Sequence, residues 1–199
     1  MSGLRVCMTG GIACGKSLLS RYLNELGVET LDADDVVHEL LPDPAERRRI
    51  AAEVFADPEK RKALEAKLHP LVKARIDGWL DRTNRTDVTS GTGGTGSQSS
   101  NTNNQTIKIA IIPLLFEAHW EENYDIIVCV ASSREKQIER MTTTRSMTRA
   151  EAEARLAAQL PVEEKARRSH YVVRNDGTAD ELREEARKFV DWLRNRQTA

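Results

Sequence analysis

The sequence has few of the features that mark secreted, membrane-spanning or nucleic-acid-binding proteins. Its three cysteines are widely spaced and follow no metal-ligand pattern, which disfavours a disulfide scaffold and a zinc site. No apolar run approaches the roughly 20 residues that span a bilayer. Lysine and arginine (30) nearly balance aspartate and glutamate (31), so a broad nucleic-acid-binding surface is not expected.

The N-terminal residues run directly into strand-like sequence and lack the layout of a signal peptide. We therefore expect a cytoplasmic protein with reduced thiols, with no membrane and no nucleic acid among its partners. A chain of 199 residues is long enough for one compact core together with lobes or a lid.

Short apolar segments alternate with amphipathic ones along the chain. Strands are predicted at residues 4–8, 28–31, 107–115, 126–130 and 171–174. Helices are predicted between Lys16 and Gly27, at 71–82, and after capping boxes at 132–135, 148–151 and 178–181. His69-Pro70 is expected to end a charged helix, because the residue before proline avoids helical geometry. This alternation predicts an α/β fold with a doubly wound, five-stranded parallel sheet.

Residues 84–105 are unlike the rest of the chain. They are rich in glycine, serine, threonine and asparagine and show no apolar pattern. Such composition predicts a flexible, low-complexity loop.

The segment from Gly10 to Ser17 fits the phosphate-binding pattern G-x-x-x-x-G-K-[ST]. It follows a predicted strand and opens a predicted helix, so backbone N–H groups and the helix N-terminus would face phosphate oxygens. Lys16 would reach the β- and γ-phosphates, and the Ser17 hydroxyl would bind Mg²⁺. A glycine turn that only joins strand to helix is the alternative, but it leaves Lys16-Ser17 unexplained.

Two carboxylates follow the second predicted strand, in Asp32-Ala33-Asp34. Ligands bind outside the carboxyl ends of strands in open α/β sheets. Residues two apart on an extended segment point the same way, so one carboxylate could hold Mg²⁺ through water while the other accepts a proton. Asp34 or Asp35 could equally be the N-cap of the next helix, and the pattern alone leaves both readings open.

Several ordered strings extend the pattern beyond these two motifs. They are Thr9 to Ser17, LDADDVVHELL, RKALEAKLHPLVKARI with His69-Pro70, IIPLLFE (Ile111 to Glu117), RMTTTR, RLAAQLPVEEK and YVVRNDGT. Taken together, these strings resemble the dephospho-CoA kinase family, the last enzymes of coenzyme A biosynthesis. The P-loop alone is common, whereas its combination with the other strings is far more specific.

The resemblance implies that the γ-phosphoryl group of ATP is transferred, with Mg²⁺, to the ribose 3′-hydroxyl of dephospho-CoA. It implies a P-loop NTPase core at 1–35, 106–133 and 170–199. A helical acceptor (CoA) domain would occupy 36–83 and a helical lid 134–169. We also expect a monomer.

Site residues follow from the same match. Asp34 would be the catalytic base, supported by Asp32, with Lys16 and the lid residue Arg140 stabilising the transferred group. The nucleotide would be held by Gly11, Ile12, Ala13, Cys14, Gly15, Lys16, Ser17, Leu18, Arg145 and Asn175. The acceptor would meet Asp34, His69, Leu114, Leu115 and Glu117. Arg155 and Gln159 match lid residues of the family.

Some alternatives stay open. His69 before proline could be a structural linker, and the lid arginines could form a solvated helix face. Ile111 stands where many relatives carry aspartate, so the metal would depend on Ser17, Asp34 and phosphate oxygens. The stretch from Leu41 to Val54 is shorter than expected for the family. Another small P-loop kinase, acting on a nucleoside, nucleotide or shikimate-like acceptor, and a non-catalytic ATP-binding switch are the competing functions.

Overall fold

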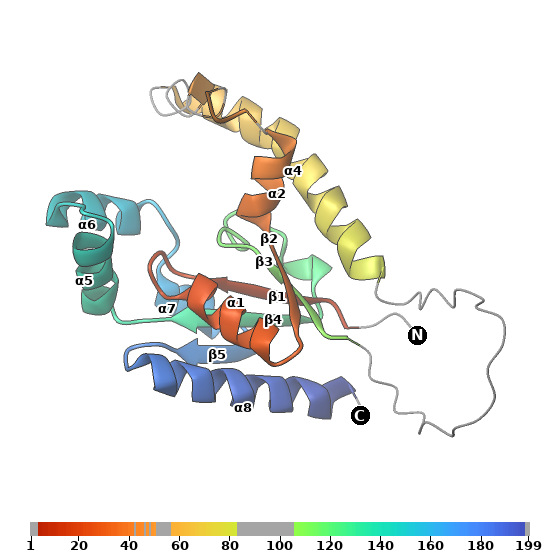
Figure 1. Ribbon diagram of the computed structural model, residues 1–199. Helices are drawn as coiled ribbons and strands as arrows, with labels where there is room; N and C mark the ends of the chain where they lie inside the picture. Colours follow the sequence, from red (N-terminus) through yellow and green to blue (C-terminus); the bar gives the residue numbers. More distant parts are fainter. Residues whose placement is uncertain are drawn as a thin grey trace.

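The computed structural model describes residues 4–41, 43–45, 47, 49–50, 57–82 and 106–197. A five-stranded sheet with strand order β2-β3-β1-β4-β5 forms the centre, and each pair of neighbours is parallel (Figure 1). The strands are β1 (Val6–Gly10), β2 (Glu29–Asp32), β3 (Lys108–Ile111), β4 (Ile126–Ala131) and β5 (Tyr171–Arg174). The predicted five-stranded parallel α/β fold is therefore confirmed. The predicted loop 84–105 lies outside the described residues.

Helices cover both faces of this sheet, because successive strand residues point to opposite sides. On one face, Val6 and Met8 of β1 pack with α1 (Lys16–Glu25) and α8 (Ala179–Gln197). On the other face, Cys7 packs with the second half of α4 (Pro58–Asp81). Near β4 and β5, the short helix α7 (Val162–Arg167) covers the same sheet through Ala166.

The third strand is shorter than predicted. It ends at Ile111, and the last ladder bond runs from the Ile112 N–H to the Met8 carbonyl at 2.9 Å. Pro113 has no N–H to continue the ladder, so the chain turns there instead. A turn-rich segment then leads to the short 3-10 helix η2 (Glu121–Asn123). The prediction that the strand reaches residue 115 was wrong.

The predicted break at His69-Pro70 is also absent, because α4 runs through Pro70 as one helix. Proline removes a single helix hydrogen bond, and tertiary packing can offset that loss. Val72, Ile76 and Leu80 supply this packing, since all three are buried against the sheet. Figure 1 shows α2 (Ala33–Leu40) and α4 together on the opposite side of the molecule from α8.

Two helices, α5 (Arg134–Thr144) and α6 (Arg149–Ala157), project beyond the end of the sheet (Figure 1, left). They share a small core of Ile138, Met141 and Ala152. The capping box at Thr148 and Glu151 is present as predicted. The N-cap of α5 is Ser133, one residue after the predicted Ser132. Within the predicted lid 134–169, therefore, only α5 and α6 stand apart, while α7 belongs to the core.

None of the described helices is long and apolar enough to cross a membrane.

Candidate active site

The loop after β1 has the backbone geometry of an anion cradle. Gly10 and Gly15 have φ values of +148° and +93°, and Ala13 has +57°, a conformation that non-glycine residues rarely adopt. A side chain at Gly10 would place Cβ 2.3 Å from the Val130 carbonyl oxygen. Glycine at 10 therefore lets the loop leave β1 directly beside β4.

Helix α1 begins without a cap of its own. Its N-cap is Gly15, which offers no side-chain hydrogen bond, and its first turn holds no acidic residue. The first N–H groups of a helix have no intrahelical acceptor. Within the described residues they find no protein acceptor here either, so they and the helix dipole favour an anion at this point.

Three consecutive carbonyls of the loop are held by side chains. Gln137 Nε2 donates to the Ile12 oxygen at 2.7 Å. Arg140 donates to the Ala13 oxygen at 3.2 Å, and Asn175 Nδ2 donates to the Cys14 oxygen at 2.8 Å. These contacts fix the peptide planes between Ile12 and Gly15, and the Cys14 N–H closes the turn by donating to the Gly11 carbonyl at 3.4 Å. The shape of the loop is therefore set by the protein itself.

Lys16 lies folded over the same loop. Its Nζ donates to the carbonyls of Gly10 at 3.1 Å and Gly11 at 2.9 Å. Burial lowers the pKa of Lys16, and the nearby charge of Lys165 lowers it further. A phosphate beside Lys16 would act in the opposite direction and raise the pKa of the ammonium.

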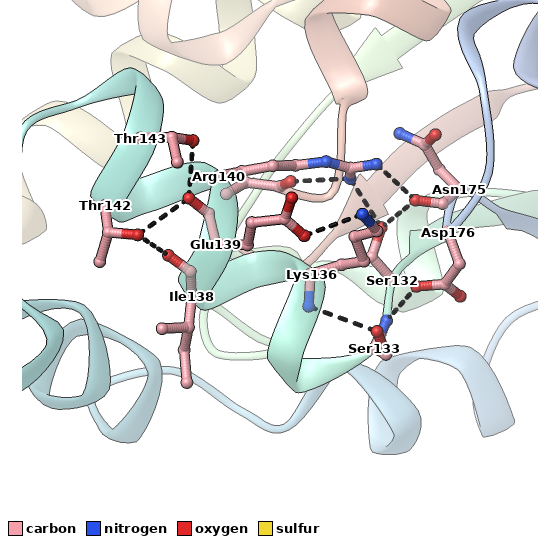
Figure 2. A network of polar contacts seen from close by, with 11 residues as sticks. Ser132, Ser133, Lys136, Ile138, Glu139, Arg140, Thr142, Thr143, Asn175 and Asp176 are labelled. Atoms are coloured by element: carbon pink, nitrogen blue, oxygen red, sulfur yellow. Dashed lines mark hydrogen bonds and ion pairs between the residues drawn. The ribbon is translucent and has the colours of Figure 1, made fainter.

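The Arg140 side chain forms hydrogen bonds to three segments: the P-loop, the end of β4 and the end of β5 (Figure 2). Besides the Ala13 carbonyl, its guanidinium donates to Ser132 Oγ at 3.0 Å and to the Asn175 carbonyl at 2.7 Å. Ser132 Oγ itself donates to the Asn175 carbonyl at 2.7 Å. In this arrangement Arg140 joins α5 to the P-loop and to the end of β5, and Asn175 uses its amide to support the loop.

Asp32 and Asp34 lie in different environments, because α2 begins between them. Asp32 is the N-cap, and its Oδ1 accepts from the Asp34 N–H at 2.9 Å. The alternative reading of Asp34 or Asp35 as the N-cap, which the sequence left open, is therefore wrong. Asp34 lies in the first helical turn rather than on an extended segment. The Asp34 side chain is exposed, whereas burial raises the pKa of Asp32. Of the two carboxylates, Asp34 is thus the more accessible from solvent.

The residues predicted for the acceptor fall into two groups. His69 on α4 lies edge-on to the Trp120 ring at 5.3 Å, and Leu114 is exposed after β3. Leu115 is fully buried in the core, because the chain has turned at Pro113, so its side chain faces the core and not a ligand. Glu117 forms an ion pair with Lys165 at 2.8 Å and accepts from the Leu160 N–H.

A cavity of about 410 Å³ lies between the P-loop and the lid helices. It is lined by Gly11 and Ile12 from the loop, by Gln137 from α5, and by Leu156 and Gln159 at the end of α6. The predicted lid residues Arg145, which is the C-cap of α5, and Arg155, which lies on α6, are both exposed and do not line this cavity. Leu18 packs partly buried against the core below the loop.

The residues present suit a magnesium ion held mainly by its substrate. Ser17 offers an exposed hydroxyl in the first turn of α1. Asp32 ends β2 and Asp34 follows it, one strand away from β1 across β3. The described residues contain no cluster of three or more metal-ligating side chains. Mg²⁺ typically keeps several waters and uses one or two protein ligands with substrate phosphates.

Sequence reasoning missed two residues that shape this region. Gln137 is buried on the apolar face of α5 with Met141, and a polar residue in such a position signals a required hydrogen bond. Lys165 is fully buried, although it stands in a charged stretch that suggests a solvated helix. Burial raises the pKa of the Cys14 thiol and raises that of Cys129 to about 12, which disfavours the reactive thiolate form of both.

Comparisons with known proteins agree with this geometry. The sequence model of the dephospho-CoA kinase family matches residues 4–46 and 95–181. The chain belongs to the dephospho-CoA kinase family. It is 35% identical to the dephospho-CoA kinase of Synechococcus sp. (strain JA-3-3Ab), over 92% of this chain and 90% of that one. It is 34% identical to the Geobacter sulfurreducens dephospho-CoA kinase, over 88% and 91%. The chain is therefore a kinase that uses ATP.

Solved structures carry the same fold. A Thermus thermophilus protein matches with a TM-score of 0.74 and 30% identity, over 96% of this chain and 98% of that one. The Campylobacter jejuni dephospho-CoA kinase matches with a TM-score of 0.66 and 22% identity, over 95% and 96%. Shikimate kinase from Acinetobacter baumannii matches at 0.60 with 15% identity, over 100% and 97%, which shows a shared fold only.

Proposed function

We propose that this dephospho-CoA kinase family member transfers the γ-phosphoryl group of ATP to the ribose 3′-hydroxyl of dephospho-CoA, giving coenzyme A and ADP. One observation carries the proposal beyond family membership. The uncapped N-terminus of α1 faces a loop whose three consecutive carbonyls are held by Gln137, Arg140 and Asn175. Such a loop suits the terminal phosphates of a nucleotide.

The transfer would need little covalent help from the protein. The 3′-oxygen attacks the γ-phosphorus, the bond to the β,γ-bridging oxygen breaks, and the hydroxyl proton passes to the Asp34 carboxylate. Negative charge develops on the phosphoryl oxygens, which suits Lys16 and the loop N–H groups as stabilising partners. Asp32 orients Asp34 by capping the same helical turn.

We infer that Mg²⁺ accompanies ATP, with the Ser17 hydroxyl as its protein ligand. The ion would neutralise phosphate charge when bound. His69 lies on α4, and the exposed Leu114 lies in the turn that follows β3. Both residues would border the acceptor. The monomeric state and cytoplasmic location stay predictions.

The direct test mixes the purified protein with Mg-ATP and dephospho-CoA and follows coenzyme A by mass spectrometry. ADP release is measured in parallel with nucleosides, nucleotides and shikimate as acceptors. The highest kcat/KM is expected with dephospho-CoA. A better acceptor would overturn the proposed substrate, and tight ATP binding without any product would favour the switch.

Changing Asp34 to Asn tests the base. Removing a positioned general base costs about 100-fold or more in rate, so kcat should fall by that much while the Kd for ATP stays near wild type. Asp35→Asn is the matched control, because Asp35 is exposed in the same first turn of α2. A near-wild-type kcat for Asp34→Asn, or an equal loss in both variants, would contradict the assignment.

A further inference from the structure

The side chain of Lys165 is fully buried, which is unusual for a lysine. Its Nζ lies 2.8 Å from the Pro113 carbonyl and 2.8 Å from Glu117 Oε1. Thr9 Oγ1, at the end of β1, donates to the same Pro113 carbonyl at 3.3 Å. The lysine thus ties α7 to the turn that follows β3.

Glu117 extends this connection to the lid. Its Oε1 also accepts from the Leu160 N–H at 3.0 Å. Leu160 lies between the end of α6 at Ala157 and the start of α7 at Val162, where the chain returns from the lid to the core. One carboxylate oxygen therefore joins the return stem of the lid, residues 158–161, to the segment that carries Leu114.

The other stem of the lid is fixed separately. The Ser133 N–H donates to Asp176 Oδ1 at 2.6 Å, just after β5 (Figure 2). The first stem is thus held on the β5 side and the return stem on the β3 side. Helix α5 also contacts the P-loop directly through Gln137 and Arg140, so the two stem attachments add to these contacts in placing α5 and α6.

A buried ion pair is weak evidence for added stability, because apolar replacements of similar volume are often equally stable. The same turn and helix are already joined by a second pair, Glu121 with Arg168, whose guanidinium also lies 4.3 Å above the Phe116 ring. Among the residues that the structure describes, this second pair forms no hydrogen bond or ion pair with the return stem. The feature peculiar to Glu117 and Lys165 is therefore their hold on Leu160.

We infer that Glu117 and Lys165 are positioning residues that fix the return stem of the lid to the acceptor-side turn. This inference rests on the proposed kinase function for its kinetic consequence. A lid set at the correct position excludes water from the γ-phosphate while the acceptor hydroxyl is in place. Loosening the stem should therefore divert ATP to water, forming ADP and inorganic phosphate in place of phosphorylated acceptor.

The kinetic test compares ADP formed with coenzyme A formed, under saturating ATP and dephospho-CoA. Glu117→Leu should lower kcat about tenfold and raise the ratio of ADP to coenzyme A at least about twofold, since small misplacements carry large rate penalties. Glu117→Gln keeps an oxygen for the Leu160 N–H and should lie between this variant and wild type. Simple destabilisation would lower both products together and leave the ratio unchanged.

Glu121→Gln is the matched control, because it breaks the neighbouring pair on the same turn and helix and should leave the ratio at the wild-type value. The double variant Glu117→Leu with Lys165→Met removes the unpaired buried charge, so thermal stability should recover while the ratio stays raised. The inference would be overturned if the double variant gave the wild-type ratio of ADP to coenzyme A, or if Glu121→Gln raised that ratio.

A second measurement needs no activity and remains informative if a variant is weakly folded. Hydrogen exchange at the Leu160 amide should be faster in Glu117→Leu and Glu117→Gln than in wild type and Glu121→Gln. Equal exchange in all four would overturn the role. If wild type forms no coenzyme A, only the proposed function fails. The hydrogen-exchange result still decides whether Glu117 holds the return stem.

Discussion

At the scale of single residues, Asp32 has a structural role beside Asp34, the proposed catalytic base. Its carboxylate caps α2 through the Asp34 N–H, and burial raises its pKa above the usual value of 3.8. The folded state therefore binds the Asp32 proton more tightly than the unfolded state. Between pH 3.8 and the raised folded pKa, this group makes folding less favourable as the pH rises.

This sign leads to a prediction for Asp32→Asn. Asparagine is as good an N-cap as aspartate, so the bond to the Asp34 N–H is kept while the cost of a partly buried charge is removed. Tm at pH 7 should equal or exceed that of wild type, and any advantage should shrink as the pH falls through the folded pKa. Calorimetry from pH 7 to pH 4 measures this difference, and a Tm advantage that grows on acidification would contradict it.

At the scale of elements, the P-loop was foreseeable as a motif but its support was not. The glycine spacing and Lys16-Ser17 predict a phosphate loop because only that backbone brings N–H groups inward. The hydrogen bonds from Gln137 and Asn175 to the loop carbonyls come from residues more than 100 positions away in the sequence. Spacing within the motif carries no information about such partners, so they became visible only with the tertiary structure.

A glycine comparison tests how tightly β1 and β4 confine the loop. Gly10→Ala would place Cβ 2.3 Å from the Val130 oxygen, a clash with backbone that should cost about 3 kcal/mol of stability. Gly27→Ala is the control, since φ there is +81° but nothing lies within 4 Å, so strain alone should cost about 1 kcal/mol. Urea unfolding measures both, and equal costs would show that the close approach to Val130 is unimportant.

At the scale of the whole molecule, α4 is attached to the core at one end. Arg5, just before β1, donates to Asp81 Oδ1 at 2.9 Å, pairs with Asp77, and donates from Nε to the Asn123 carbonyl at 3.1 Å. Its backbone N–H donates to Asp125 at 2.8 Å. This network joins α4, which carries His69, to the sheet and to the turn before β4.

Arg5→Met should loosen the orientation of α4 while leaving the P-loop untouched. The side-chain pairs are partly exposed, so stability should fall by only about 1 kcal/mol. The KM for dephospho-CoA should rise severalfold, whereas the Kd for ATP should stay at the wild-type value. Steady-state kinetics and nucleotide titration separate the two effects, and a parallel loss of ATP affinity would show that Arg5 supports the whole core instead.

Local information in the chain was sufficient for the fold class and the phosphate loop. Alternating apolar segments predict parallel strands and helices, and Gly10 to Ser17 carries its own backbone requirements. The length of β3 and the continuity of α4 depended on whether tertiary packing offsets the hydrogen bond that a proline cannot make. The residues next to Pro113 and Pro70 in the sequence do not show the outcome.

Contacts between distant segments decided the rest. Packing against the sheet made α7 part of the core and buried Lys165, and this burial required a carboxylate that Glu117 supplies. The same geometry turned Arg140 and Asn175 toward loop carbonyls. Sequence therefore determined the order of strands and helices and the position of the phosphate-loop motif, because those depend on neighbours along the chain. Tertiary structure alone decided which side chains hold the loop and the lid, because those pairings join residues far apart in the chain.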